Sequence, residues 1–148
     1  MSSWLVVRAA ARVIAIPATA VEEVVELPDA LPVPGRTGAV RGVIPIRGRL
    51  LPLAHLADAI GLAGAPRAGA GVVLQTGGRR LVLAVDEVTD LVTVPMEGLP
   101  HGWEGGWASA ALRGPASLVP ILDPAWLLQR LDRDAERPAQ AAEGVTTA

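Results

Sequence analysis

The stretch Val43-Ile44-Pro45-Ile46-Arg47-Gly48-Arg49-Leu50-Leu51-Pro52-Leu53 carries much of the information about the fold. Two short apolar runs rich in Val, Ile and Leu flank a polar centre, which is the pattern of two buried strands joined by a turn at Arg47-Gly48-Arg49. Pro45 and Pro52 interrupt these runs. Because proline donates no ladder hydrogen bond, we expect both strands to lie at sheet edges or to carry bulges.

The same pattern recurs on both sides of this stretch. Residues 5–7 and 13–16 predict one hairpin, and residues 72–74 and 81–85 predict another around Gly77-Gly78, a pair suited to a tight turn with positive φ. A compact stretch from His55 to Ile60, ended by Gly61, predicts a short helix. We therefore expect an all-β chain with short helices.

A weak internal repeat emerges when the chain is shifted by 68 residues. Residues 50–53 then meet residues 118–121, and both copies run into a helix, the second with Asp123 as N-cap and Pro124 in its first turn. Two readings stay open, namely two similar barrel-like halves or a chance match of common aliphatic residues. We expect one domain over residues 1–131 and a disordered tail over residues 132–148.

Composition narrows the class of protein. The chain has 148 residues, 51% of them apolar, which is enough for a core of its own, and it has no cysteine for disulfides or thiolate chemistry. Its net charge is -2, its arginines are scattered, and it contains neither Phe nor Tyr, which argues against a nucleic-acid surface. No secretory signal or span of about 20 apolar residues is visible, so we expect a cytoplasmic protein without membrane insertion.

Candidate chemistry is sparse. His55 and Asp58 could share one helix face, but a third metal ligand is missing, so we predict no metal site. The carboxylates of Asp86, Glu87 and Asp90 are interpreted as the polar exit of a buried strand rather than as an acid and base pair. No phosphate-binding glycine loop or nucleophile elbow is present, so we predict a protein that is not an enzyme and needs no cofactor.

The four tryptophans supply all of the aromatic side chains of the Phe, Trp and Tyr types in the chain. Trp103 and Trp107 lie in a glycine-rich segment, where the indoles either form a contact surface or fold back over the core, and both readings stay open. Trp126, on the last apolar helix, is expected in the core.

Several blocks of the sequence resemble the CheW-like family of chemotaxis proteins. Residues 40–53 look like its central Gly-Val-Ile-Asn-Leu-Arg-Gly segment and following strand, and residues 20–24 are similar to its Val-x-Glu-Ile element. Residues 83–88 resemble its Val-Asp-x-Val element, and residues 118–123 its closing strand, in family order from Trp4 to Leu131. The resemblance implies two intertwined, SH3-like five-stranded barrels around a shared core.

The same resemblance implies the work of an adaptor. It would couple methyl-accepting chemoreceptors to a CheA-type histidine kinase through protein-protein binding alone, at receptor arrays on the inner face of the membrane. One surface would engage the kinase regulatory domain and a groove between the barrels the cytoplasmic tip of the receptor. The positions that match kinase-contact motifs are Val21, Glu23 and Arg47. The positions in elements linked to receptor contact are Gly42, Leu81 and Val88.

Two positions depart from the family pattern. Pro45 stands where the family usually has Asn, and His55 stands where it usually has Asp. Pro45 removes a side-chain hydrogen-bonding group and a backbone donor close to Arg47, so we expect the kinase-facing turn to be altered. This leaves an alternative function open, a divergent CheW-like scaffold or regulatory module that binds only one of the two partners.

Overall fold

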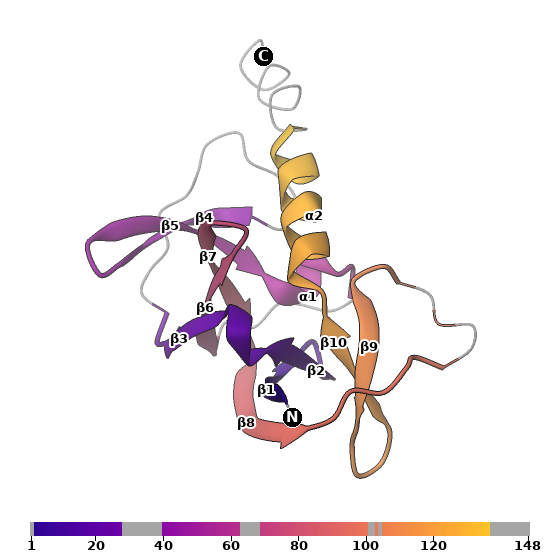
Figure 1. Ribbon diagram of the computed structural model, residues 1–148. Helices are drawn as coiled ribbons and strands as arrows, with labels where there is room; N and C mark the ends of the chain where they lie inside the picture. The colour runs from indigo at the N-terminus through magenta and orange to yellow at the C-terminus, as the bar shows by residue number, and fades with distance from the viewer. Residues whose placement is uncertain (1, 28–39, 63–68, 101–102, 104, 137–148) are drawn as a thin grey trace.

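Strands dominate the molecule. The computed structural model describes residues 2–27, 40–62, 69–100, 103 and 105–136 (Figure 1). The strands are β1 (Ser2–Ala9), β2 (Arg12–Pro17), β3 (Val21–Val25), β4 (Val40–Ile46), β5 (Arg49–His55), β6 (Ala70–Thr76), β7 (Arg79–Val85), β8 (Glu87–Val94), β9 (Ala108–Arg113) and β10 (Leu118–Leu122). The helices are the 3-10 turn η1 (Ala18–Ala20), the short α1 (Leu56–Ala59) and the longer α2 (Pro124–Glu136). None of the described helices is long and apolar enough to cross a bilayer.

The strands form two five-stranded sheets that exchange hairpins. Sheet A has the order β8-β1-β2-β10-β9, and sheet B has the order β3-β6-β7-β5-β4. The N-terminal hairpin β1–β2 thus completes a sheet whose other strands come from the second half of the chain, and β6–β7 completes the sheet of β3, β4 and β5. Each sheet contains one parallel pair, β10 with β2 and β5 with β7. The predicted all-β fold of two intertwined barrel-like units is confirmed.

Three hairpins turn through two residues with positive φ. These are Ala10-Ala11 (φ 50 and 65), Arg47-Gly48 (φ 51 and 78) and Gly77-Gly78 (φ 57 and 73). Two positive φ values in succession are the geometry of a type I′ turn, whose twist matches that of the flanking strands. The hairpins predicted from the sequence are confirmed, and the Gly-Gly turn is the one whose residues suit this geometry without strain.

The two prolines of the central hairpin have different environments. Ile46 pairs with Arg49 beside the turn, so Pro45 and Leu50 form the next pair, which in such a ladder exchanges no hydrogen bonds. The nitrogen of Pro45 therefore faces the open edge of β4, and pairing with β5 is undisturbed. The expected alteration of this turn is not seen in the backbone pairing.

The expectation that both proline-bearing strands lie at edges or carry bulges is right for β4, which is an edge strand with a register shift between Val40 and Gly42, and wrong for β5. Strand β5 lies inside sheet B between β4 and β7, and its parallel pairing with β7 begins at Leu53, the residue after Pro52. In sheet A, β10 pairs with β2 at Ile121, the residue after Pro120. A proline is tolerated in both interior strands because it stands where the parallel ladder has not yet begun.

Three apolar clusters hold the sheets together. The largest lies between them and contains Val7, Ile14, Leu74 and Leu83, all essentially inaccessible to solvent, together with residues of both α-helices. A second cluster fills sheet B around Ile44 and Val82, and a third fills sheet A around Trp4 and Ile121. The shared cluster makes the two sheets one packed body.

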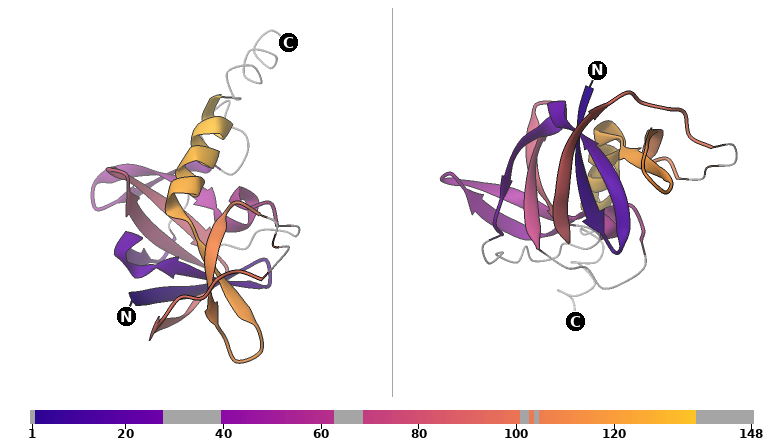
Figure 2. Two further views of the ribbon diagram at one scale, coloured as in Figure 1. Left: turned by 45° about the vertical axis from the view of Figure 1, so that its right-hand side comes forward. Right: turned by 90° about the horizontal axis from the view of Figure 1, so that it is seen from below.

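Helix α2 begins as the sequence predicted and packs along the shared core (Figures 1 and 2). The Asp123 carboxylate accepts a hydrogen bond from the backbone N–H of Ala125 at 3.0 Å, the contact of an N-cap. Leu127 and Leu131 are buried, and Trp126 is half-buried against the same core. The helix continues past residue 131 to Glu136, and the rest of the expected tail lies outside the described residues.

Candidate functional site

A β-bulge in β3 decides which way the side chains of Val21 and Glu23 point. Val21 lies opposite Leu74 of β6 and Glu23 lies opposite Val73, so Glu22 is left between them as an extra residue. Opposed residues on neighbouring strands share a face, and successive residues of β6 point to opposite faces. Val21 therefore packs against the shared core, whereas Glu23 lies on the side of the cluster that fills sheet B.

Arg47 reaches Glu23 from the opposite edge of sheet B. Its Nε donates to Glu23 Oε1 at 2.8 Å and its Nη2 donates to Oε2 at 2.7 Å, a bidentate pair. Arg47 lies in the β4–β5 turn and Glu23 on β3, so the pair joins the two edge strands and closes the sheet. Arg47 makes this contact from a left-handed backbone conformation with φ 51, which costs a non-glycine residue about 1–2 kcal/mol.

The electrostatics of this pair are mutual. Hydrogen bonds from Arg47 hold the pKa of Glu23 below its ordinary value, although desolvation of the carboxylate opposes the shift. The same hydrogen bonds raise the pKa of Arg47, which stays cationic. The Arg47 side chain is 76% exposed and that of Glu23 is 22% exposed. The arginine is therefore the member that a partner protein could reach.

Apolar side chains surround the ion pair and form a shallow groove of about 420 Å³. Val25, Leu27 and Ile46 supply its apolar surface, and Glu26 and Pro45 complete the lining. We call this region, together with Glu23 and Arg47, the sheet B mouth. A second hollow of about 220 Å³ adjoins it, lined in part by Arg47 and Arg49. Beside it, Arg80 Nε donates to Glu22 Oε2 at 2.7 Å.

The sheet B mouth has the character of a protein contact surface. Apolar area surrounded by charged groups of fixed geometry provides both binding area and partner selection. In the part of the chain that the structure describes, no three His, Asp or Glu side chains gather in a group that could hold a metal ion. The three predicted kinase-contact residues thus divide into Glu23 and Arg47, which meet here, and Val21, which does not.

The three predicted receptor-contact residues are not brought together on one surface. Leu81 is 2% exposed within the shared core, and Val88 is half-buried against the same cluster. Gly42 is buried in β4, where it pairs with Leu53 in the sheet B cluster. Val88 is the member of this group with side-chain surface left to offer.

The two indoles whose role stayed open take different places. Trp107 is buried in the shared core, while Trp103 is half-buried and lines a cleft at one end of sheet A. Their rings meet edge to face with centroids 5.6 Å apart, and the guanidinium of Arg12 lies over both. Trp107 therefore covers the core, and Trp103 lines a surface cleft.

Sequence reasoning missed the ion pairs between strands distant in the chain. Glu22 with Arg80, and Glu97 with Arg113, are joined by the sheet topology and by no local spacing pattern. The Glu97–Arg113 pair joins the segment after β8 to β9, the two edges of sheet A, as the Glu23–Arg47 pair joins the two edges of sheet B. The backbone of Glu97 also exchanges hydrogen bonds of 2.7 and 2.9 Å with Ala111, which links the segment after β8 to β9. The 68-residue repeat was the one signal for the second of these pairs. It places a turn near residue 115 that corresponds to the Arg47 turn, and Arg113 lies beside it.

Comparisons with known proteins agree with this architecture. A family model described as the CheW-like domain matches residues 3–132. The structure is similar to that of the scaffolding protein TtCheW from Thermoanaerobacter tengcongensis, with a TM-score of 0.75 and 17% identity, covering 82% of this chain and 88% of that one. No curated protein matches the sequence. Because the family model spans nearly all of the described strands, the chain belongs to the CheW-like domain family of chemotaxis adaptors.

Proposed function

We propose that the protein is a non-enzymatic adaptor that couples methyl-accepting chemoreceptors to a CheA-type histidine kinase in the cytoplasm, at receptor arrays on the inner face of the membrane. The observation that carries the proposal is the bidentate Glu23–Arg47 pair at the sheet B mouth. Two residues that match kinase-contact motifs of the family, far apart in the sequence, meet there beside an apolar groove. The groove provides area for the kinase regulatory domain, and Arg47 supplies the exposed charge that selects it.

The receptor-contact residues support the proposal in a more limited way. Val88 offers a half-buried side chain between the sheets, and Leu81 would act on receptor binding by setting the packing of the two sheets rather than by touching the receptor. Because Gly42 and Leu81 are both buried, the alternative of a module that binds only the kinase keeps specific support.

Binding measurements with a kinase regulatory domain and a receptor-tip fragment separate these functions. We expect both fragments to bind the wild-type chain, whereas an adaptor that binds one of them alone would contradict coupling. Arg47→Asp places a second carboxylate beside Glu23, and we expect it to weaken kinase binding by about tenfold or more. The matched control is Arg113→Asp, which breaks the corresponding ion pair of sheet A.

A charge swap tests whether the kinase contacts the Glu23–Arg47 pair directly or whether the pair is needed only for the fold of the adaptor. The double variant Glu23→Arg, Arg47→Glu keeps an ion pair between β3 and the β4–β5 turn but reverses the charge exposed at the turn. We expect the swap to keep the thermal stability close to that of the wild type and still to lose kinase binding. Full kinase affinity in the folded swap variant would remove the pair from the binding site.

A further inference from the structure

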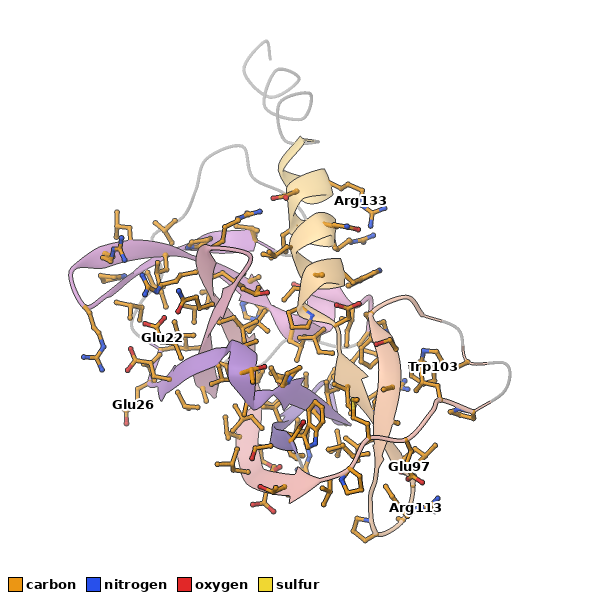
Figure 3. All side chains as sticks on the ribbon, viewed as in Figure 1. Glu22, Glu26, Glu97, Trp103, Arg113 and Arg133 are labelled. Carbon is orange, nitrogen blue, oxygen red and sulfur yellow. The ribbon has the colours of Figure 1, made fainter. Side chains whose placement is uncertain are left out.

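Strand β3 brings two neighbouring carboxylates within reach of the exposed guanidinium of Arg47. In a regular strand Glu22 and Glu23 would point to opposite faces of the sheet, but Glu22 is the extra residue of the β3 bulge. Glu22 and Arg47 consequently line the same hollow beside the sheet B mouth. Figure 3 shows Glu22 on the opposite side of the view from Glu97 and Arg113, so the ion pair of sheet A takes no part in this arrangement. Arg47 therefore has two possible carboxylate partners.

Both carboxylates act on Arg47, but they lie in different places. The hydrogen bonds and charge of Glu23 contribute most to the raised pKa of Arg47, and the charge of Glu22 adds to the same shift. Glu23 lines the groove of the sheet B mouth, whereas Glu22 lines the hollow beside it and not the groove. A bond to Glu23 therefore keeps the guanidinium at the groove, and a bond to Glu22 would draw it away. Since the position of a fixed charge governs partner selection, the choice matters for binding.

Arg80 engages Glu22 and leaves Glu23 to Arg47. Its Nε donates a charge-assisted hydrogen bond to Glu22 Oε2 at 2.7 Å. The side chains of Arg80 and Glu22 are 35% and 34% exposed, so solvent screens this pair less than it screens a fully exposed one. Arg80 lies on β7, which is held to β3 through the strand β6 between them. The contact is thus anchored on the interior strands of sheet B.

Arg49 shows that lining the hollow is not sufficient for this contact. Arg49 borders the same space, yet it forms no ion pair with any residue that the structure describes. Of the three arginines around the hollow, Arg80 is therefore the one that occupies Glu22. The division of partners depends on it.

From this arrangement we infer that Arg80 is a positioning residue for kinase binding. By occupying Glu22, it commits Arg47 to Glu23. The inference rests on the proposed kinase contact at the sheet B mouth and names the residue that fixes the charge exposed there. Arg80 acts through the two carboxylates and makes no contact with the kinase itself. When Arg80 is absent, Glu22 is free to compete, and the Arg47 guanidinium divides between two partners.

Two substitutions introduced one after the other test this role. Arg80→Gln frees Glu22, and we expect the affinity for the kinase regulatory domain to fall about threefold, the scale of one exposed ion pair. Adding Glu22→Gln removes the competing carboxylate, so the double variant should bind the kinase as tightly as the wild type. Affinity for the receptor-tip fragment should stay unchanged in both variants. An arginine that touched the kinase, or one needed only for the fold, would not be compensated by the loss of Glu22.

A measurement on the adaptor alone separates this inference from the proposed function. The NMR coupling across the hydrogen bond from Arg47 Nε to the Glu23 carboxyl carbon identifies the partner of Arg47 directly. We expect this coupling to be weaker in Arg80→Gln than in the wild type and to return in the double variant. If the kinase domain fails to bind the wild-type chain, the proposed function is wrong, and the coupling still shows whether Arg80 commits Arg47 to Glu23.

The neighbouring arginine supplies the matched control. Arg79→Gln breaks the Arg79–Asp132 ion pair, whose members are about half exposed and line neither the groove nor the hollow. It should change neither the kinase affinity nor the coupling, and thermal unfolding should show that all variants are folded. Full kinase affinity in Arg80→Gln would overturn the inference. So would a loss that Glu22→Gln does not restore, or a coupling that does not respond to Arg80→Gln.

Discussion

Single residues at the edges of the sheets carry the functional interpretation. Glu23 and Arg47 could be named from the family resemblance, but their contact could not, because it depends on a bulge that turns Glu23 away from the face that Val21 occupies. Arg12 gave no signal at all, since an isolated arginine in a strand is ordinary. The two indoles that lie over Arg12 belong to Trp103 and Trp107, which are distant from it in the sequence.

The lowered pKa of Glu23 makes the ion pair sensitive to acid. A carboxylate whose folded pKa is depressed stabilises the fold above its ordinary pKa, and this contribution is lost as pH falls through the depressed value. For Glu23 the loss begins below the ordinary value of 4.5. NMR titration of the Glu23 side-chain carboxyl should therefore give a pKa under 4.5 in the wild type, and Arg47→Gln should raise it.

A neighbouring arginine provides the control for that titration. Arg49→Gln removes a cation from the same hairpin without removing either hydrogen bond to Glu23, so the pKa of Glu23 should stay low. A Glu23 pKa that does not respond to Arg47→Gln would show that the carboxylate is held by something other than this pair.

Elements of the fold divide into those that local sequence determines and those that it does not. The Gly77-Gly78 turn, the Asp123 cap and the helix ended by Gly61 follow from residue types at adjacent positions, and sequence analysis found them. The interior place of β5 was missed because Pro52 argues for an edge when only the strand itself is considered. Pro52 is tolerable because the parallel pairing of β5 with β7 begins only at Leu53, and β7 is distant in the chain.

Relieving the backbone strain of the β1–β2 turn should stabilise the folded protein. Replacing Ala10-Ala11 by Asn-Gly, the preferred pair for a type I′ turn, should raise the free energy of unfolding by about 1 kcal/mol, since the strain relieved exceeds the added backbone entropy. Urea denaturation should show a higher midpoint with an unchanged slope. The mirror change, Gly77-Gly78 to Ala-Ala, should lower the midpoint. A turn variant no more stable than the wild type would mean that these alanines are unstrained.

The whole molecule is defined by the exchange of hairpins between sheets. Local patterning cannot reveal this exchange, because the strands have the same neighbours within each hairpin whether it stays with its own half or crosses to the other. The family resemblance supplied the intertwined arrangement, and the topology confirms it. One consequence is that the hollow beside the sheet B mouth and the cleft at the end of sheet A each contain residues from both halves of the chain.

This exchange predicts that neither half folds alone. Residues 1–62 retain the β1–β2 hairpin without its neighbours β8 and β10, and retain β4 and β5 without β7, so the shared apolar cluster cannot form. Cleaving the folded protein at a protease site engineered into residues 63–68 should leave the two halves associated on gel filtration. After denaturation and separation, each half should give the narrow amide NMR spectrum of an unfolded chain, and equimolar mixing should restore the dispersed spectrum. Cooperative unfolding of either isolated half would contradict the exchange, because a half that folds alone must pair its own hairpin with its own remaining strands.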